Sequence, residues 1–228
     1  MKHLEDWWAV FVQGGNMTER ERMISGKLYN PYMISDNPWA EIRAACKKFN
    51  ESDFWSDRSA LDELKGHFAE AGEDMVLTHP FYCDHGDKIY FGKHFYANTG
   101  LTILDENAVI FGDDVFLGPH VSIYTAGHPL SAEVRNLELE YARVVKIGDS
   151  VWIGGNVVIN PGVTIGDDVV IGSGSVVTKD IPSHVIAAGV PCKVIREITE
   201  DDIIFWRKEL EGYQNDVAFR QNGLIENA

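Results

Sequence analysis

The sequence predicts a mainly β fold, a parallel β-helix whose coils stack into a triangular prism. From residue 147 an aliphatic residue recurs at every sixth position through residue 177. Glycine, asparagine and β-branched residues fill many of the positions between these anchors, and such residues favour short strands and tight corners over helix. A six-residue period also drifts off the 3.6-residue face of a helix. Internal repeats of this kind are the signature of stacked-coil folds.

The repeat has a strict part and a looser part upstream. Eighteen residues make one turn of three strands, which gives coils at 91–108, 111–128, 147–164 and 165–182. Two extra residues, Val109 and Ile110, separate the upstream trios. The alternative, a β-sandwich, would not keep a six-residue phase over this length. The anchors are Phe91, Ala97, Ile103, Phe111, Leu117, Ile123, Ile147, Ile153, Ile159, Ile165, Ile171 and Val177.

The polar segment 129–146 interrupts the repeat, and we expect it to project from a corner of the prism as a loop. Long excursions from a rigid scaffold are often functional. His128 stands at the root of this segment, which favours a functional role for it.

The flanks predict helices. Residues 1–75 form an N-terminal helical segment with helices at 40–49 and 59–70, and 76–196 form the β-helix region that carries the loop. Residues 197–228 form a C-terminal helix, capped by Thr199 and extending to about residue 215, and a tail. We expect the helices to cover the open ends of the prism, whose edges could otherwise recruit further strands.

Composition excludes several classes of partner. The chain has 228 residues and a net charge of −15, which argues against nucleic acid as a partner. No apolar run approaches the roughly 20 residues of a membrane span, and no signal peptide is recognisable. The three cysteines, Cys46, Cys83 and Cys192, lack CxxC spacing, which favours a reducing, cytoplasmic location.

Several motifs carry a family resemblance. They are MTERERMISGKLYN (17–30), FYAN (95–98), LTILD (101–105), GHP (127–129), VWIGGNVVINPGVTIGDDVVIGSGSVVTKDIP (151–182) and AAGVPCKVIRE (187–197). Together they make most of 17–200 similar to the hexapeptide-repeat acetyltransferases of the maltose and galactoside O-acetyltransferase branch, which includes the nodulation acetyltransferases. The resemblance implies a left-handed winding, a homotrimer, acetyl-coenzyme A as co-substrate, and transfer of its acetyl group to a sugar-like hydroxyl without a metal.

By this resemblance His128 is the general base. An alcohol attacks a thioester poorly until its proton is removed, and histidine, with an ordinary pKa of about 6.5, suits that task at neutral pH.

The resemblance also assigns binding residues. Amide and carboxylate groups suit an acceptor made of hydroxyls, whereas basic side chains would meet the phosphates of coenzyme A. A position after SGKLYN that is often acidic in relatives is Pro31 here. The acceptor residues are Asp84, Tyr96, Asn98, Asp105 and Glu106, and the coenzyme A residues are Gly155, Ser173, Thr178, Lys179, Lys193 and Arg196.

Two alternatives remain open. The acceptor could be an antibiotic, such as a streptogramin or chloramphenicol, or serine. A zinc site like that of the similar gamma-class carbonic anhydrases would need three gathered histidines. His94, His120 and His128 occupy the fourth, tenth and eighteenth places of their coils, so none stacks on another.

Overall fold

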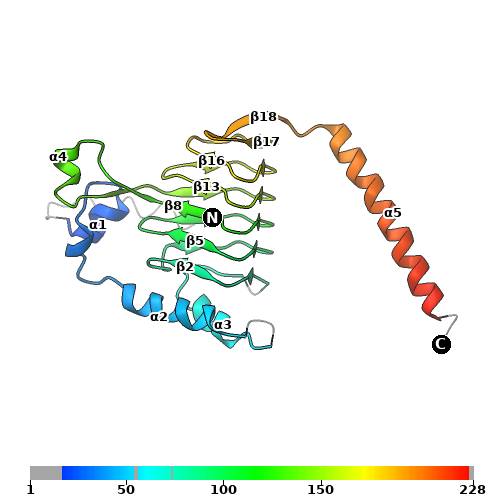
Figure 1. The fold of residues 1–228 in the computed structure, drawn as a ribbon, viewed down its shortest axis with the longest axis horizontal. Helices are drawn as coiled ribbons and strands as arrows, with labels where there is room; N and C mark the ends of the chain where they lie inside the picture. The colour runs from blue at the N-terminus through cyan, green and yellow to red at the C-terminus, as the bar shows by residue number, and fades with distance from the viewer. Residues whose placement is uncertain (1–16, 54–55, 73, 226–228) are drawn as a thin grey trace.

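The computed structural model describes residues 17–53, 56–72 and 74–225, in which three parallel sheets form a triangular prism (Figure 1). The first face holds β1 (Val76–Leu77), β4 (Tyr96–Ala97), β7 (Phe116–Leu117), β12 (Trp152–Ile153), β15 (Val170–Ile171) and β17 (Val185–Ala188). The second face holds β2 (Phe81–Cys83), β5 (Leu101–Leu104), β8 (Ser122–Tyr124), β13 (Val158–Ile159) and β16 (Val176–Val177). The third face holds β3 (Ile89–Tyr90), β6 (Val109–Phe111), β11 (Val145–Ile147) and β14 (Thr164–Ile165).

The anchors of the repeat lie in register inside this prism. On the first face, for example, Ile153 pairs with both Leu117 and Ile171. All twelve predicted anchors are at most 3% exposed, so every coil contributes its apolar side chains to one continuous core. The predicted parallel β-helix is therefore confirmed.

We call the corner between the second and third faces the second corner. In the early coils this corner contains two more residues than in the later coils. Val109 and Ile110 are ordinary strand residues, since β6 pairs with both β3 and β11. The two extra residues therefore fall within 105–108, and the prediction that placed them at Val109 and Ile110 is wrong. This wider corner carries the polar residues described below.

Three histidines occupy corner positions of the coils. His94 and His184 stand at the corner between the third and first faces, and His120 stands at the corner between the first and second faces, the first corner. Each has a positive φ, between 52° and 62°, which is a left-handed conformation uncommon for residues other than glycine. His94 lies 3.1 Å from both Asp74 and Asp114. These histidines thus shape corners and do not gather into one site.

The N-terminal helices cover one end of the prism, as expected. In α2 (Trp39–Asn50) and α3 (Ser59–Lys65) the apolar side chains of Ile42, Phe49 and Leu61 join the core beside the first coil. However, α3 ends at Lys65 and not near residue 70. The chain turns at Gly66 because Glu70 already pairs with Tyr90 of the third face. Residues 1–16 of the predicted N-terminal segment lie outside the described residues.

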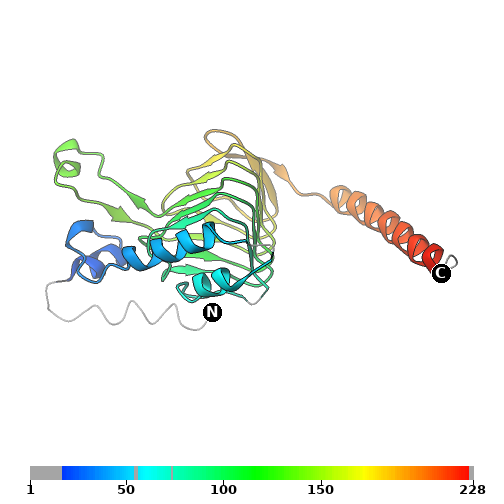
Figure 2. The same cartoon turned by 60° about the horizontal axis from the view of Figure 1, so that its bottom comes forward.

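The C-terminal helix does not cover the other end. Instead β18 (Lys193–Glu197) adds antiparallel to β17, and α5 (Glu200–Ile225) then extends away from the prism (Figures 1 and 2). It is longer than predicted and leaves large apolar side chains exposed, Trp206 among them. Thr199 directly precedes the helix, at the predicted cap position, and its backbone N–H and hydroxyl both donate to the Asp202 carboxylate at 2.9 Å. No described helix is long and apolar enough to cross a membrane.

The predicted projecting loop is confirmed as an arm at the second corner. It contains the antiparallel pair β9 (Ala126–Gly127) and β10 (Tyr141–Ala142), with the short helix α4 (Ala132–Arg135) between them. Its last residues already belong to β11. The N-terminal helix α1 (Glu19–Ile24) and the 3-10 turn η2 (Pro31–Met33) lie beside the arm (Figure 2). A small separate core joins the two, formed by Met23, Tyr29, Ile34 and Ala142.

Candidate active site

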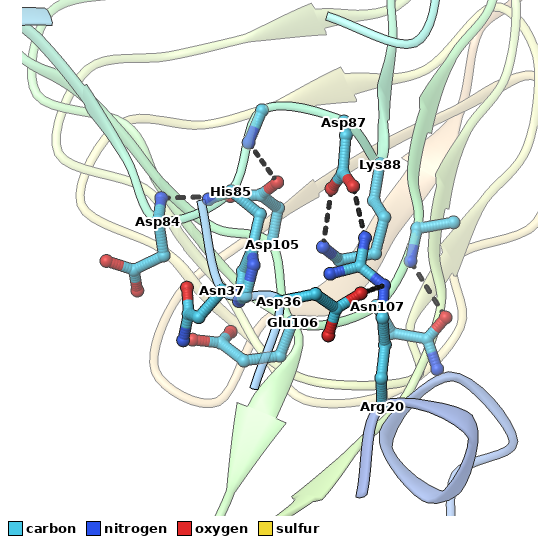
Figure 3. Close-up of polar contacts among 12 residues, drawn as sticks. Arg20, Asp36, Asn37, Asp84, His85, Asp87, Lys88, Asp105, Glu106 and Asn107 are labelled. Carbon is cyan, nitrogen blue, oxygen red and sulfur yellow. Dashed lines mark hydrogen bonds and ion pairs between the residues drawn. The ribbon is translucent and has the colours of Figure 1, made fainter. Parts of the chain in front are cut away.

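Asp105 organises the second corner from beneath. Its carboxylate is fully buried and accepts hydrogen bonds from the backbone N–H groups of Asp84 at 3.0 Å, His85 at 2.9 Å and Gly86 at 2.7 Å (Figure 3). An acceptor molecule cannot reach a carboxylate that is buried and saturated in this way. Asp105 therefore positions the turn that carries Asp84, which corrects the expectation of a direct acceptor contact.

A charged network docks α1 against the same corner. Asp87 bonds both Lys88, at 2.7 Å, and Arg20, whose Nε lies 3.5 Å from Asp36 (Figure 3). Lys88 and His85 are almost wholly buried. Burial, followed by the charge of Lys88, lowers the pKa of His85 to about 3, so this imidazole is neutral at physiological pH. It is therefore part of the structure of the corner and is not suited to act as a base.

Glu106 is a buried carboxyl group with an unusual proton affinity. Burial and then the negative charge of Asp84 raise its pKa to about 8. The Thr125 hydroxyl lies 3.4 Å from Glu106 Oε2, and Asp84 itself is only partly buried. The corner therefore presents two neighbouring carboxyl groups, of which the protonated Glu106 can donate as well as accept hydrogen bonds, which suits a ligand rich in hydroxyls.

His128 follows β9 at the root of the arm, and 57% of its side chain is exposed. Its Nδ1 lies 3.4 Å from the Leu139 carbonyl oxygen on the returning strand of the arm. A carbonyl only accepts, so this contact places the proton on Nδ1 and leaves the Nε2 lone pair available. Nε2 lies 4.0 Å from Glu140 Oε1. The arm thus presents an accessible, oriented imidazole that can take up a proton.

The other predicted residues lie elsewhere on the prism. Asn98, Gly155 and Ser173 stand at the first corner, and Tyr96 lies in β4 just before it. Asn98 donates its backbone N–H to Leu117 O at 3.0 Å and accepts from Thr99 N–H at 2.8 Å. Within one chain the second face separates these residues from His128 and Glu106. The structure therefore brings together only part of the predicted set.

The predicted coenzyme A residues are also divided. Thr178 and Lys179 follow β16 at the second corner, whereas Lys193 and Arg196 lie on β18. The Arg196 guanidinium already pairs with both oxygens of Asp202, at 2.6 and 2.9 Å. Beside this pair, Trp152 and the first turns of α5 line a groove of about 530 Å³.

The histidines considered for a zinc site lie apart from one another on the prism. Among the residues that the structure describes, no group of three or more His, Cys, Asp or Glu side chains is placed to hold a metal ion. His94, His120 and His128 stand at three different corners of the prism.

Sequence reasoning missed the residues that hold the arm. The Tyr29 hydroxyl donates to Glu140 Oε2 at 2.6 Å across 111 positions of sequence. No periodicity or spacing marks such a pair. The only available signal was that Tyr29 lies within the SGKLYN motif and that Glu140 lies in the segment that follows His128.

Comparisons with known proteins agree with this architecture. The family model "Bacterial transferase hexapeptide (six repeats)" matches residues 145–179. The chain is similar to a galactoside O-acetyltransferase of Escherichia coli (strain K12), with 43% identity over 85% of this chain and 96% of that protein.

Two solved structures are similar over most of the chain. One is a galactoside acetyltransferase in complex with coenzyme A, with a TM-score of 0.78, 45% identity, and coverage of 82% of this chain and 94% of the other. The second is a maltose O-acetyltransferase from Clostridium difficile 630, with a TM-score of 0.76, 43% identity, and coverage of 82% and 100%. The repeat, the projecting arm and these similarities agree, and the chain belongs to the hexapeptide-repeat acetyltransferases of the galactoside and maltose O-acetyltransferase family.

Proposed function

We propose that this protein is an acetyl-coenzyme A-dependent O-acetyltransferase that acts on a hydroxyl of a sugar-like acceptor, with His128 as general base. The observation that carries the proposal is the exposed imidazole at the root of the arm, whose Nδ1 faces the Leu139 carbonyl and whose Nε2 is available. The relatives' names support the reaction class, and the coenzyme A complex of a similar structure supports the donor.

The reaction follows from the groups present. His128 Nε2 takes the proton of the acceptor hydroxyl as its oxygen attacks the thioester carbonyl, which gives a tetrahedral intermediate. The N–H of Gly155 stabilises the oxyanion, since a backbone donor aimed at developing charge is effective in such a step. The C–S bond then breaks, and the proton passes from His128 to the departing thiolate. The acceptor is held by Glu106 and Asp84, with Asn98 and Tyr96 contributing from the first corner.

Assembly as a homotrimer would complete this site. The first-corner residues and the second-corner residues lie on opposite sides of the second face, so a neighbouring prism is needed to bring the two sets together. Lys179, Lys193 and Arg196 supply local positive charge for the phosphates of coenzyme A on a chain whose net charge is −15. Ser173 and Thr178 line the path of the pantetheine arm.

His128→Ala tests the proposal. We expect the variant to keep its assembly and its coenzyme A affinity while turnover falls on the order of 10²-fold or more, as for a lost general base. Thiol release from acetyl-coenzyme A would be followed with galactosides, maltose, chloramphenicol, a streptogramin and serine, for wild type and variant together. Retained turnover in a folded His128→Ala protein would refute the mechanism, and a preference for serine or an antibiotic would refute the acceptor class.

A further inference from the structure

A buried tyrosine connects the N-terminal segment to the arm that carries His128. Tyr29 is fully buried in the small core with Met23, Ile34 and Ala142. Its backbone forms two hydrogen bonds with that of Glu140, one from each N–H, at 3.0 and 2.9 Å. The returning strand of the arm is therefore fixed to a part of the chain outside the prism.

Asn107 strengthens this connection from the prism side. Its side-chain amide lies within hydrogen-bond distance of the carbonyl oxygens of Ile24, at 3.0 Å, and Ala142, at 3.3 Å. One side chain thus joins α1, the second corner and the arm. These contacts among α1, the second corner and the arm together fix the position of Glu140 relative to the prism.

The Glu140 carboxylate lies between two functional groups. Its Oε2 accepts the Tyr29 hydroxyl at 2.6 Å, and its Oε1 lies 4.0 Å from His128 Nε2. The carboxylate is only 20% exposed. Burial and the hydrogen bond to Glu140 raise the pKa of Tyr29, so the phenol remains a neutral donor at working pH. The phenol therefore holds one oxygen, while the other remains close to the imidazole.

The distances indicate how this carboxylate acts. At 4.0 Å the contact between Glu140 and His128 is too long for a hydrogen bond, so the interaction is electrostatic. It is absent while the imidazole is neutral and appears once Nε2 has taken up a proton. A carboxylate held at this distance stabilises the imidazolium by charge attraction. The Leu139 carbonyl, one residue earlier, holds the opposite side of the ring.

We propose that Glu140, held by Tyr29, is a positioning residue that orients His128 and stabilises its protonated form during acetyl transfer. This inference rests on the proposed role of His128 as the general base. Other charges near this region are Arg135, which bonds the Pro129 and Leu130 carbonyls, and Glu106 and Asp84, which act electrostatically on Tyr29. None of these three forms a hydrogen bond or ion pair with the His128 ring in the described part of the chain, whereas Glu140 Oε1 lies 4.0 Å from its Nε2.

The test compares Glu140→Gln, Tyr29→Phe and the double variant with wild type in a pH profile of kcat/KM. We expect Glu140→Gln to lower kcat about 10-fold and to move the acidic half-maximum of the profile down by about half to one pH unit, since removing a nearby negative charge disfavours the imidazolium. The KM for acetyl-coenzyme A should change little. Tyr29→Phe should give a smaller change in the same direction. The double variant should match Glu140→Gln within about twofold, because Tyr29 acts through Glu140.

Glu133→Gln is the matched control, since it makes the same chemical change at an exposed position of the same arm. We expect it to leave the profile unchanged. An unmoved acidic limb in folded Glu140→Gln, with His128→Ala inactive, would overturn this inference and leave the proposed function standing. Turnover by His128→Ala would instead remove the proposed function. If Glu140→Gln does not fold, Tyr29→Phe decides, because phenylalanine keeps the buried ring: an unchanged profile then overturns the inference.

Discussion

Asp105 lies directly beneath the turn that carries Asp84, and its buried carboxylate accepts the Asp84 N–H at 3.0 Å. Two further N–H groups, those of His85 and Gly86, bond to the same side chain. Because backbone groups take up both oxygens, Asp105 acts on the candidate acceptor site only through the geometry of this turn. The sequence resemblance suggested that the residue belongs to the site, and the structure changes its role from contact to support.

Asp105→Asn tests this supporting role. The amide keeps one acceptor oxygen but directs an NH₂ group towards a backbone donor, which leaves buried N–H groups unsatisfied. We expect the free energy of unfolding to fall by about 1–3 kcal/mol, measured by urea denaturation. The KM for the acceptor should rise, whereas the KM for acetyl-coenzyme A should not. A fully stable variant with unchanged kinetics would contradict the proposed support of Asp84.

The buried Glu106 carboxyl predicts a dependence of stability on pH. Its folded-state pKa of about 8 lies above the ordinary value, because burial and then Asp84 disfavour ionisation. Between the ordinary value and about pH 8 the folded state holds a proton that the unfolded state releases. The contribution of this group to stability is therefore complete below the ordinary value and is lost as pH rises towards 8.

Glu106→Gln removes this titration and keeps the shape of the side chain. We expect the variant to gain stability relative to wild type by about 1 kcal/mol or more on going from pH 5 to pH 8. Urea denaturation of both proteins at these two pH values measures the difference. Parallel changes in wild type and variant would mean that Glu106 ionises normally in the folded protein.

The pairing of Arg196 with Asp202 predicts competition for the phosphates of coenzyme A. Asp202 accepts from both terminal guanidinium nitrogens, so a phosphate that binds this end of the Arg196 side chain competes with the carboxylate. Asp202→Asn should tighten coenzyme A binding by up to about fivefold, the modest effect expected when an exposed ion pair no longer competes. Isothermal titration calorimetry provides the measurement, and Asp201→Asn, at the neighbouring exposed position, provides the control. Equal affinities in all three proteins would mean either that Arg196 does not bind a phosphate of coenzyme A or that Asp202 does not compete with that phosphate.

Gly148 lies at the corner between the third and first faces, where the structure leaves no space for a side chain. A Cβ there would lie 2.2 Å from Asp167 Oδ1 and 2.8 Å from the Gly166 carbonyl carbon. That carboxylate is fixed by the Asp149 N–H at 2.9 Å, so the coils would have to separate. Gly148→Ala should lower the free energy of unfolding by about 2 kcal/mol or more.

Gly212→Ala makes the same substitution where nothing lies within 4 Å, in the exposed part of α5. It should stabilise the helix by up to about 1 kcal/mol. Thermal denaturation followed by circular dichroism distinguishes the two variants. Equal stabilities would mean that the coils do not approach each other as closely at Gly148 as the structure indicates.

The sequence by itself determined the prism. A six-residue alternation of apolar anchors and small residues can bury its apolar side chains only by coiling, so residues as distant as Phe111 and Ile147 could be placed in register. His128 became a candidate from sequence as well, because it stands where the repeat breaks and its GHP motif carries the family resemblance. Period alone did not determine the length of α5, which depends on local helix propensity beyond the last coil, or the hand of the winding, which was taken from the resemblance.

Only the tertiary structure decided how the site is held. The contact of Tyr29 with Glu140 joins the N-terminal segment to the arm, and the support of Asp84 by Asp105 joins the second corners of two successive coils. Such contacts arise when separate surfaces pack together, and their energies depend on the distance and burial of single polar atoms. A sequence pattern records which residues face inward along one element, but it carries no measure of the distance between side chains on different elements.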